Sequence, residues 1–314
     1  MANLQMNEGF WFETRVDAVG KDVSAMQYLA MLYPFRDWRE RFGSGKVLRN
    51  GLVLAGDERV ARGDVVRSFR EPWVEPPIDD TLEVLAETDA LVVVNKRKEY
   101  PVVPHGDFLR HSLLGIVRRA YPEAAPLHRL GRGTTGAIVF SKSNQAARQY
   151  CRLFQGREVK KVYRCVVAGV PAWDELDSEC FIGPVPHEGC NGGVFGAVPV
   201  GGGENKRAFT KFTVVKRGEG WAVLDANIFT GRPHQIRIMT GFVGFPLLGD
   251  PLYGVGGVPK ADGVVFDEFG HDRPAAPGDT GYLLHSMVIE IADVKCVSVA
   301  PPNKEEWAKY MTWW

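Results

Sequence analysis

The chain has 314 residues, of which 45% are hydrophobic and 24% are charged. These proportions are typical of a soluble globular protein, and the length allows one large domain or two smaller ones. Lysine plus arginine equals aspartate plus glutamate at 38 each, so the formal net charge is zero. This balance excludes a uniformly basic, histone-like nucleic-acid-binding protein, but it leaves room for a locally basic groove.

The five cysteines are scattered along the chain. Their odd number and irregular spacing predict no disulfide framework and favour a reducing compartment. No apolar run approaches the length of a membrane span, and the first residues lack the apolar core of a secretory signal. We therefore expect a cytoplasmic protein, with an organelle as the alternative, and no membrane partner.

The first part of the chain has the pattern of a small α+β module. Apolar residues recur at helical spacing over 23–33, and a second short helix is expected over 36–42. Asn50-Gly51 lies between two apolar runs, which predicts a hairpin because both residues tolerate the positive φ of a type I′ turn. The proline-rich, acidic stretch 71–80 is the best linker. We therefore expect an N-terminal module over residues 1–75 and a second domain over 76–314.

Beyond this linker, short β-rich runs outnumber helical patterns. Strands are expected at 91–95, 137–141, 162–168, 209–215, 221–226 and 288–291. Helices are expected at 109–119, 144–154 and 234–240. This succession predicts an α+β fold built on a mixed, mainly antiparallel sheet. The glycine-rich stretch 189–203 predicts an irregular surface loop.

Cys180, His187 and Cys190 could be imagined as zinc ligands. A structural zinc site needs four ligands, usually with a CxxC pair, and both are missing here. The sequence also lacks a GxSxG turn that would present a nucleophilic serine. We therefore expect no metal and no serine-hydrolase site.

The densest polar motif is TGRPHQIR at 230–237, which places Arg232, His234 and Arg237 within six residues with Gln235 between them. Two arginines can hold a phosphate or a carboxylate in a planar fork. The alternative is a solvated helix start, since charged runs are often only surface. The following GFPLLGDPLYG is rich in glycine and proline, which predicts a shaped loop.

Together with LHRLGRGTTG and KKVYRCVVAG, this motif makes the chain resemble the RluA-type pseudouridine synthase family. Four segments stand in the family order, at 89–104, 128–136, 161–163 and 230–237, and GDPLYG and Leu284-His285 follow them. The resemblance spans residue 76 to about residue 291. It implies a pseudouridine synthase fold with a central cleft. It also implies conversion of uridine to pseudouridine in RNA after base flipping, without a cofactor.

The resemblance also implies roles for individual residues. Tyr163 would lie against the flipped base, Arg129 would fill the space that the base leaves, and Arg237 would pair with a catalytic aspartate. Gly131 stands where that aspartate is expected, so the catalytic set is Tyr163, Arg237 and the altered position Gly131. The substrate-binding residues that we expect are Lys96, His128, Arg129, Arg132, Arg232, His234 and Gln235.

The missing aspartate leaves alternatives open. Asp107, Asp225 or Asp250 could pair with Arg237, an RNA phosphate could do so, or the site could be wetter and inactive. The chain is then either a synthase with a displaced carboxylate or a modified mechanism, or a catalytically silent RNA-binding protein that keeps the fold.

The N-terminal module weakly resembles a small RNA-binding motif that often precedes these domains, and the alternative is a cap without RNA contact. We expect a monomer whose partner is rRNA or tRNA.

Overall fold

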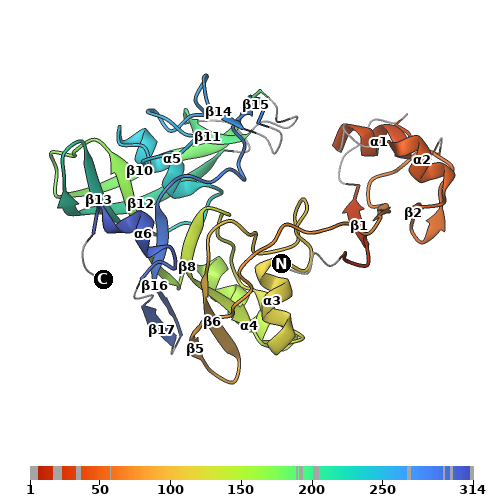
Figure 1. Cartoon of the computed structure of the whole chain (residues 1–314), viewed down its shortest axis with the longest axis horizontal. Coiled ribbons are helices and arrows are strands. Elements are labelled where there is room, and N and C mark those ends of the chain that lie inside the picture. Colours follow the sequence, from red (N-terminus) through yellow and green to blue (C-terminus); the bar gives the residue numbers. More distant parts are fainter. Residues whose placement is uncertain are drawn as a thin grey trace. The chain divides into compact units, whose positions relative to one another are not determined.

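The computed structural model describes the chain except for residues 1–5, 17–22, 33–36, 57, 189, 191–193, 201–204, 267–269, 293, 298–299 and 312–314. It contains two compact units, Met1–Pro77 and Ile78–Trp314 (Figure 1). The break between them falls inside the proline-rich stretch 71–80.

The smaller unit is a four-stranded sheet with two short helices. Its strands follow the order β1-β4-β2-β3, with bounds β1 Phe10–Arg15, β2 Val47–Arg49, β3 Leu52–Val53 and β4 Val65–Arg70. The helices are α1 (Ala25–Leu32) and α2 (Trp38–Gly43), as expected, although Tyr33 lies outside the described residues. Asn50 and Gly51 adopt φ values of 50° and 88°, which confirms the hairpin turn between β2 and β3.

The larger unit is organised around one eleven-stranded sheet, in which the main path runs β11-β10-β12-β13-β9-β16-β8-β6-β5. Its strands are β5 Val84–Glu87, β6 Leu91–Lys96, β7 Ala125–Pro126, β8 Thr134–Ser141, β9 Lys160–Ala168, β10 Glu175–Val185, β11 Val194–Val198, β12 Lys206–Arg217, β13 Trp221–Ile228, β16 Leu284–Ile291 and β17 Val294–Val297. A separate hairpin joins β14 (Val264–Phe266) to β15 (Asp272–Pro274). Within the sheet, β8 and β16 pair in parallel and the other described pairs are antiparallel, which confirms the mixed, mainly antiparallel prediction.

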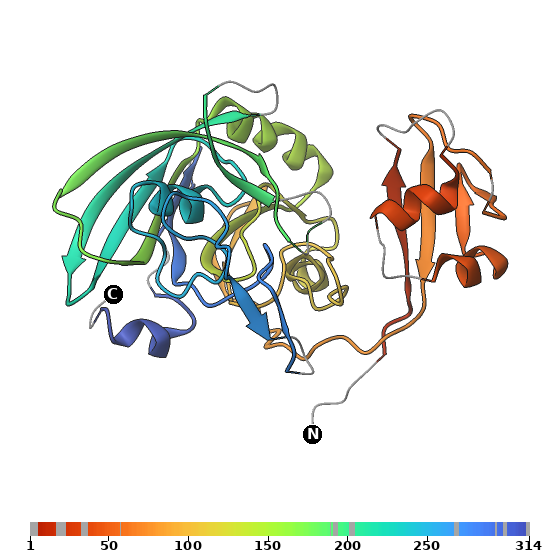
Figure 2. The same cartoon turned by 90° about the horizontal axis from the view of Figure 1, so that it is seen from above.

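The burial pattern of the strands explains their places in the sheet. Every residue of β6 and β8 is buried, as expected for central strands that are covered on both faces. In contrast, β12 alternates between buried and more exposed residues over its first half, because one face packs on the core. The long green and teal strands curve strongly in Figure 2, as large twisted sheets do.

Four helices accompany this sheet: α3 Leu113–Ala120, α4 Asn144–Gly156, α5 Gln235–Phe242 and α6 Lys304–Ala308. Helix α4 packs on β8, and α5 packs on β10, β11 and β12. The hydroxyl of Ser112 accepts the Gly115 amide hydrogen and so begins α3 later than the apolar pattern suggested.

The prediction of an irregular loop over 189–203 is wrong for its centre, where β11 pairs with β10. The many glycines in this stretch led to the prediction of a loop where the structure has a strand. Gly196 faces Gly183 across the pair, and a Cβ on Gly196 would come within 3.0 Å of the Val185 side chain. The close approach of the two strands therefore requires a glycine where sequence patterns suggest a loop.

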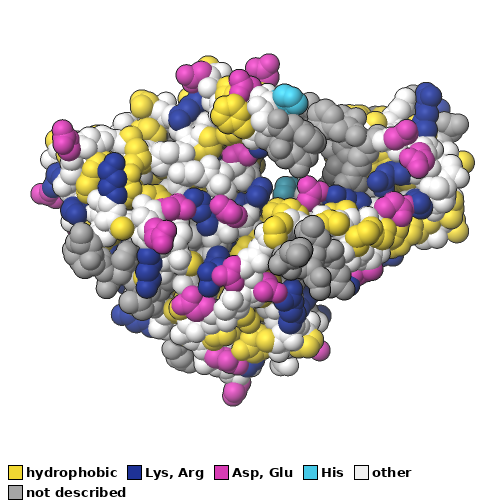
Figure 3. Space-filling view, in the orientation of Figure 1, with side chains coloured by type: hydrophobic (Ala, Val, Ile, Leu, Met, Phe, Trp, Pro, Cys, Tyr) yellow, Lys and Arg dark blue, Asp and Glu magenta, His cyan; other side chains and the backbone are white. Residues whose placement is uncertain are grey.

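Charged side chains of both signs are mixed on one face of the large unit (Figure 3). Figure 3 shows Lys and Arg side chains interspersed with Asp and Glu over its visible face, in keeping with the zero net charge. Within the described ranges, no helix is long and apolar enough to cross a membrane. The same residues contain no cluster of three His, Cys, Asp or Glu side chains that could hold a metal ion.

Candidate functional site

A buried lysine holds the loop that carries HRLGRGTTG in place through hydrogen bonds to its main chain. Lys96 ends β6, is fully buried, and donates hydrogen bonds to the carbonyl oxygens of Arg97, Arg132 and Thr134 at 2.8, 3.0 and 2.9 Å. Burial lowers the pKa of Lys96 to about 7, while the three carbonyl acceptors favour its protonated form. All three N–H groups are used within the protein, so Lys96 positions the loop in this structure.

A second set of bonds holds the same loop at Arg132. The Glu99 amide donates to the Arg132 carbonyl at 2.9 Å, and Arg132 Nε donates to the Glu99 carbonyl at 2.7 Å. The guanidinium also lies 5.0 Å from the ring centre of Phe108. Arg132 is therefore tied to the chain that follows β6, with its terminal nitrogens still able to meet a phosphate.

Arg237 forms a buried ion pair with Asp250. Arg237 Nε and Nη2 donate to the two Asp250 oxygens at 2.7 and 2.8 Å, and both side chains are almost completely buried. Asp250 Oδ1 also accepts the amide hydrogens of Leu252 and Tyr253. Of the three aspartates considered from sequence, Asp250 is the partner, whereas Asp225 pairs with Arg164 through two bonds of 2.7 and 2.9 Å.

Tyr282 connects this ion pair to Gly131. The Arg237 guanidinium carbon lies 4.3 Å from the Tyr282 ring centre, and Nη1 donates to the Pro277 carbonyl at 3.1 Å. A Cβ built on Gly131 would stand 3.0 Å from the Tyr282 hydroxyl, and one on Gly133 would stand 2.8 Å from the ring carbon that bears it. The buried phenol thus occupies the space that side chains at these two positions would need.

Tyr163 lies in the same apolar core as Tyr282, on strand β9 beside β16. It is 6% exposed, and burial raises the pKa of its hydroxyl to about 12. The phenol is therefore protonated at neutral pH. Tyr282, which contacts Arg237, therefore belongs to the same hydrophobic cluster as Tyr163.

The TGRPHQIR segment begins α5 with a network of buried hydrogen bonds. Gln235 accepts from Thr230 Oγ1 and the Arg232 amide and donates to Phe209 O and Thr210 Oγ1. Gln235 is 4% exposed and its side chain is fully engaged, so it holds the start of α5 in place.

His234 precedes α5 in the left-handed region, with φ of 52°. Its Nδ1 lies 2.8 Å from the hydroxyl of Tyr253, which in turn donates to the Phe195 carbonyl. A single hydroxyl proton cannot serve both partners, so the imidazole N–H donates to Tyr253. Burial and the charge of Arg237 lower the pKa of His234 to about 4.

His128 and Arg129 are neighbours with opposite surroundings. His128 Nε2 accepts the Val139 amide hydrogen at 3.1 Å, and its ring stacks on Phe154 at 5.2 Å. These contacts fix the His128 ring against β8 and α4. Arg129 is exposed and, among the described residues, has neither a hydrogen bond nor an ion pair, so it remains able to reach RNA.

Sequence analysis missed Tyr282 as a member of this site. Glycines at 131 and 133 were the available signal, since two residues without side chains in one motif indicate that something else fills the space. The positioning role of Lys96 was equally hidden, because its acceptors are main-chain carbonyls that no sequence pattern marks.

Comparisons with known proteins agree with this geometry. A family model described as RNA pseudouridylate synthase matches residues 90–241. RNA pseudouridine synthase 5 of Arabidopsis thaliana is 31% identical over 355 residues, which cover 95% of this chain and 94% of that protein. An uncharacterized RNA pseudouridine synthase of Synechocystis is 34% identical over 251 residues, which cover 79% of this chain and 81% of that protein.

A solved structure shares the fold. Human RNA pseudouridylate synthase domain containing 1 superposes with a TM-score of 0.55 at 23% identity, over 73% of this chain and 86% of that one. The order of motifs, the sheet and the relatives converge, and the chain belongs to the RNA pseudouridine synthase family.

Proposed function

We propose that this protein converts uridine to pseudouridine in structured rRNA or tRNA, and that Gly131 marks the position of the family's aspartate. Family membership supplies the reaction class. The observation that supports turnover in this chain is the intact Arg237–Asp250 pair beside the loop 128–136, with Tyr163 in the adjoining core. This buried ion pair holds the chain after α5 and the 277–282 segment in fixed positions around the motif loop.

The reaction exchanges one bond for another. The target nucleotide must first leave the stack, which costs a few kcal/mol. The bond from uracil N1 to C1′ of the ribose then breaks, C5 of the turned base bonds to C1′, and the C5 proton is lost while N1 gains one. Tyr163 is protonated at neutral pH because its pKa is about 12, so it can face the base and donate a hydrogen bond.

Positive charge develops on the ribose, and Gly131 offers no carboxylate to stabilise it. Asp250 does not replace it, because its side chain is completely buried in the pair with Arg237. Asp279 is the better candidate, because its side chain, although bonded to Arg273 through both oxygens, is 13% exposed. It belongs to the segment whose Pro277 and Tyr282 contact Arg237, and a Cβ on Gly278 would lie 3.8 Å from Arg132.

The surroundings of Asp279 keep it ionised. Burial alone would raise its pKa, but hydrogen bonds from Arg273 and the Ala276 amide, with the nearby charge of Arg132, lower it below its usual value. An ionised carboxylate can stabilise a neighbouring cationic sugar. In this proposal a carboxylate from the 275–282 segment serves where the family uses the motif aspartate.

The test compares wild type with Tyr163→Phe, Asp279→Asn and the control Asp225→Asn, which also loses the charge of an arginine-paired carboxylate. Each protein is incubated with total RNA from the source cell, and pseudouridine is mapped at single-nucleotide resolution. We expect the wild type and Asp225→Asn to modify the same site and the other two to lose it. RNA binding without modification by the wild type would instead identify a catalytically silent binding protein.

We also propose that the N-terminal unit helps to hold the RNA. Arg39 and Arg62 are exposed and, in the described part of this unit, lack carboxylate partners. Exposed arginines can meet phosphate oxygens. Replacing both with glutamate in the full chain should weaken RNA binding and leave the unfolding temperature of the large unit unchanged.

We further propose that the protein acts as a monomer in the cytoplasm, with an organelle as the alternative location. The five unpaired cysteines are in keeping with a reducing compartment. Sedimentation of the purified protein and fractionation of tagged cells test these two points.

A further inference from the structure

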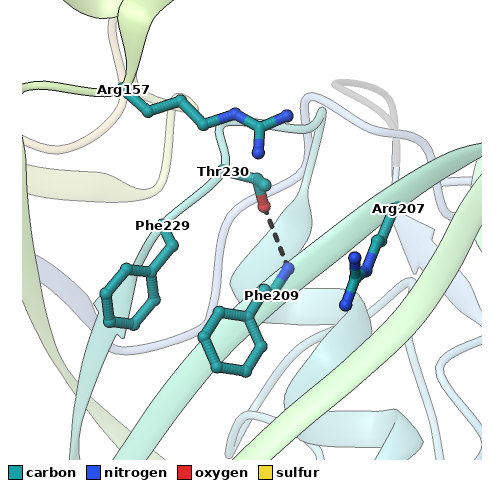
Figure 4. Close-up of a pocket in the computed structure, with 5 residues that line it drawn as sticks. All are labelled: Arg157, Arg207, Phe209, Phe229 and Thr230. Carbon is teal, nitrogen blue, oxygen red and sulfur yellow. Dashed lines mark hydrogen bonds between the residues drawn. The ribbon is translucent and has the colours of Figure 1, made fainter.

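A small cavity opens where the β-strand β12 begins and the chain leaves β13. It has a volume of about 170 Å³ and is lined by Arg157, Arg207, Phe209, Phe229 and Thr230 (Figure 4). Typical small-molecule sites measure roughly 300–1,000 Å³, so this cavity suits one planar ring rather than a whole cofactor. None of its lining residues belongs to the Arg237–Asp250 pair or to the loop 128–136.

Two phenylalanines provide an aromatic surface in the cavity. The ring centres of Phe209 and Phe229 are 4.9 Å apart with planes inclined by 34°, and Figure 4 shows the rings side by side. The Phe229 amide donates to the Phe209 carbonyl at 3.1 Å, which fixes the two backbones. Phe229 is nevertheless 45% exposed. A rigid, half-exposed aromatic ring is a surface on which a nucleobase can stack.

Three cations surround this aromatic surface. Figure 4 shows the Arg157 guanidinium extended over Thr230. Arg232 Nε donates to the Arg207 carbonyl at 3.0 Å, and the two terminal nitrogens of Arg232 remain available for a ligand. Burial and the charge of Arg157 lower the pKa of Arg232. Lys161 lies near the same segment, with Nζ 3.8 Å from where a Cβ on Gly231 would stand.

Within the described part of the chain, no carboxylate neutralises these three cations. Arg207 is paired with Glu179. Among the residues that the structure describes, neither Arg157, Lys161 nor Arg232 has a carboxylate partner, although the chain has equal numbers of acids and bases. Positive charges gathered at one place, with mutual repulsion, favour a bound anion.

We propose that this cavity holds one unpaired nucleotide of the RNA substrate, with its base stacked on Phe229 and its phosphate between Arg157 and Arg232. The inference rests on RNA being the substrate, as proposed above. The Thr230 hydroxyl already bonds Gln235 and the Phe209 amide, so few groups remain to read base edges. The site therefore accepts any base, as stacking sites do. The chain runs directly from Phe229 through Arg232 into α5, which links this contact to the helix that carries Arg237.

The experiment uses the full chain and a fluorescein-labelled oligouridylate of about 12 nucleotides, within the range of common single-strand sites. Phe229→Leu keeps the apolar volume but removes the ring, and Phe229→Tyr keeps the ring. We expect Phe229→Leu to bind roughly fivefold or more weakly and Phe229→Tyr to bind like wild type. Equal affinity of wild type and Phe229→Leu would overturn the stacking contact.

The phosphate contact is tested through salt dependence. Loss of one phosphate contact to single-stranded RNA reduces the slope of log affinity against log salt by about 0.7. We expect this change for Arg157→Gln, at the C-cap of α4, and not for Arg148→Gln, which removes another exposed arginine from inside the same helix. Identical slopes for the two variants would refute a specific site at Arg157.

Pseudouridine mapping on the same variants separates this inference from the proposed function. If wild type modifies RNA while Phe229→Leu and Arg157→Gln bind as it does, the cavity proposal is wrong and the function stands. If wild type modifies no RNA but the variants weaken binding as described, the nucleotide site stands and the proposed function is wrong.

Discussion

The hydroxyl of Tyr282 lies 3.0 Å from the point where a Cβ on Gly131 would stand, although the two residues are far apart in the sequence. Gly131 is therefore adapted to this tyrosine, and its substitution must be considered together with it. Gly131 is not among the residues with positive φ, so an aspartate there would be free of backbone strain. The obstacle to an aspartate at position 131 is the phenol.

We expect Gly131→Asp to raise pseudouridine formation most when Tyr282 is also shortened. The single variant is overpacked, at a cost of about 1–3 kcal/mol. In Gly131→Asp/Tyr282→Phe the nearest atom to the new Cβ is Thr134 Oγ1 at 3.5 Å, an ordinary contact. The double variant should unfold at a higher temperature than the single variant and form more pseudouridine on total RNA.

Tyr282→Phe alone is the control for the loss of the hydroxyl. If wild type already modifies a site and Gly131→Asp abolishes it, a carboxylate elsewhere performs the chemistry and the added charge repels it. A single variant as stable as the double variant would show that Tyr282 moves aside without cost.

We expect Arg237→Met to destabilise the protein by roughly 3–5 kcal/mol, because it leaves Asp250 buried and charged without its partner. Asp250→Asn should also destabilise the fold, since it leaves the guanidinium unpaired. The double variant Arg237→Met/Asp250→Asn should lose less stability than the sum of the two. Urea denaturation of the four proteins measures this coupling, and additive losses would contradict a coupled buried pair.

Protonation of His128 should destabilise the protein at acid pH. Burial lowers the pKa of His128 from 6.5 to about 3, so the unfolded chain binds this proton at a higher pH than the folded one. The contribution of His128 to the free energy of unfolding is fully present above pH 6.5. It declines as the pH falls from 6.5 towards 3, by up to about 1.4 kcal/mol per pH unit.

His128→Gln provides the comparison, because its side-chain oxygen can still accept the Val139 amide hydrogen but does not titrate. Unfolding temperatures at pH 7.5 and pH 5 should differ less for the variant than for wild type. An unchanged difference would show that other groups account for the acid sensitivity.

RNA affinity of the wild type should fall steeply with added salt in spite of the zero net charge. Each phosphate that a lysine or arginine neutralises releases counterions, so the loss depends on local contacts rather than on the overall charge. Titration of labelled RNA at several salt concentrations measures the slope. Affinity that is the same at low and high salt would exclude a phosphate-binding groove.

Local pattern was sufficient for most of the secondary structure and for the family. The β-rich runs at 91–95 and 137–141 predict the strands β6 and β8, and Asn50-Gly51 predicts its hairpin, because both signals depend only on neighbouring residues. The order of four motifs predicts the pseudouridine synthase family without any tertiary information. The sequence also indicates by itself that position 131 lacks a carboxylate.

Long-range packing decided the rest. Sequence analysis left three aspartates open as partners of Arg237, and the loop that follows α5 brings Asp250 to it. Tyr282 reaches Gly131 because β16 pairs with β8 and brings the chain before it beside the loop before β8. The acceptors of Lys96 are main-chain carbonyls. Periodicity and motif spacing describe neighbours along the chain, whereas these contacts join residues that only strand pairing and core packing bring together.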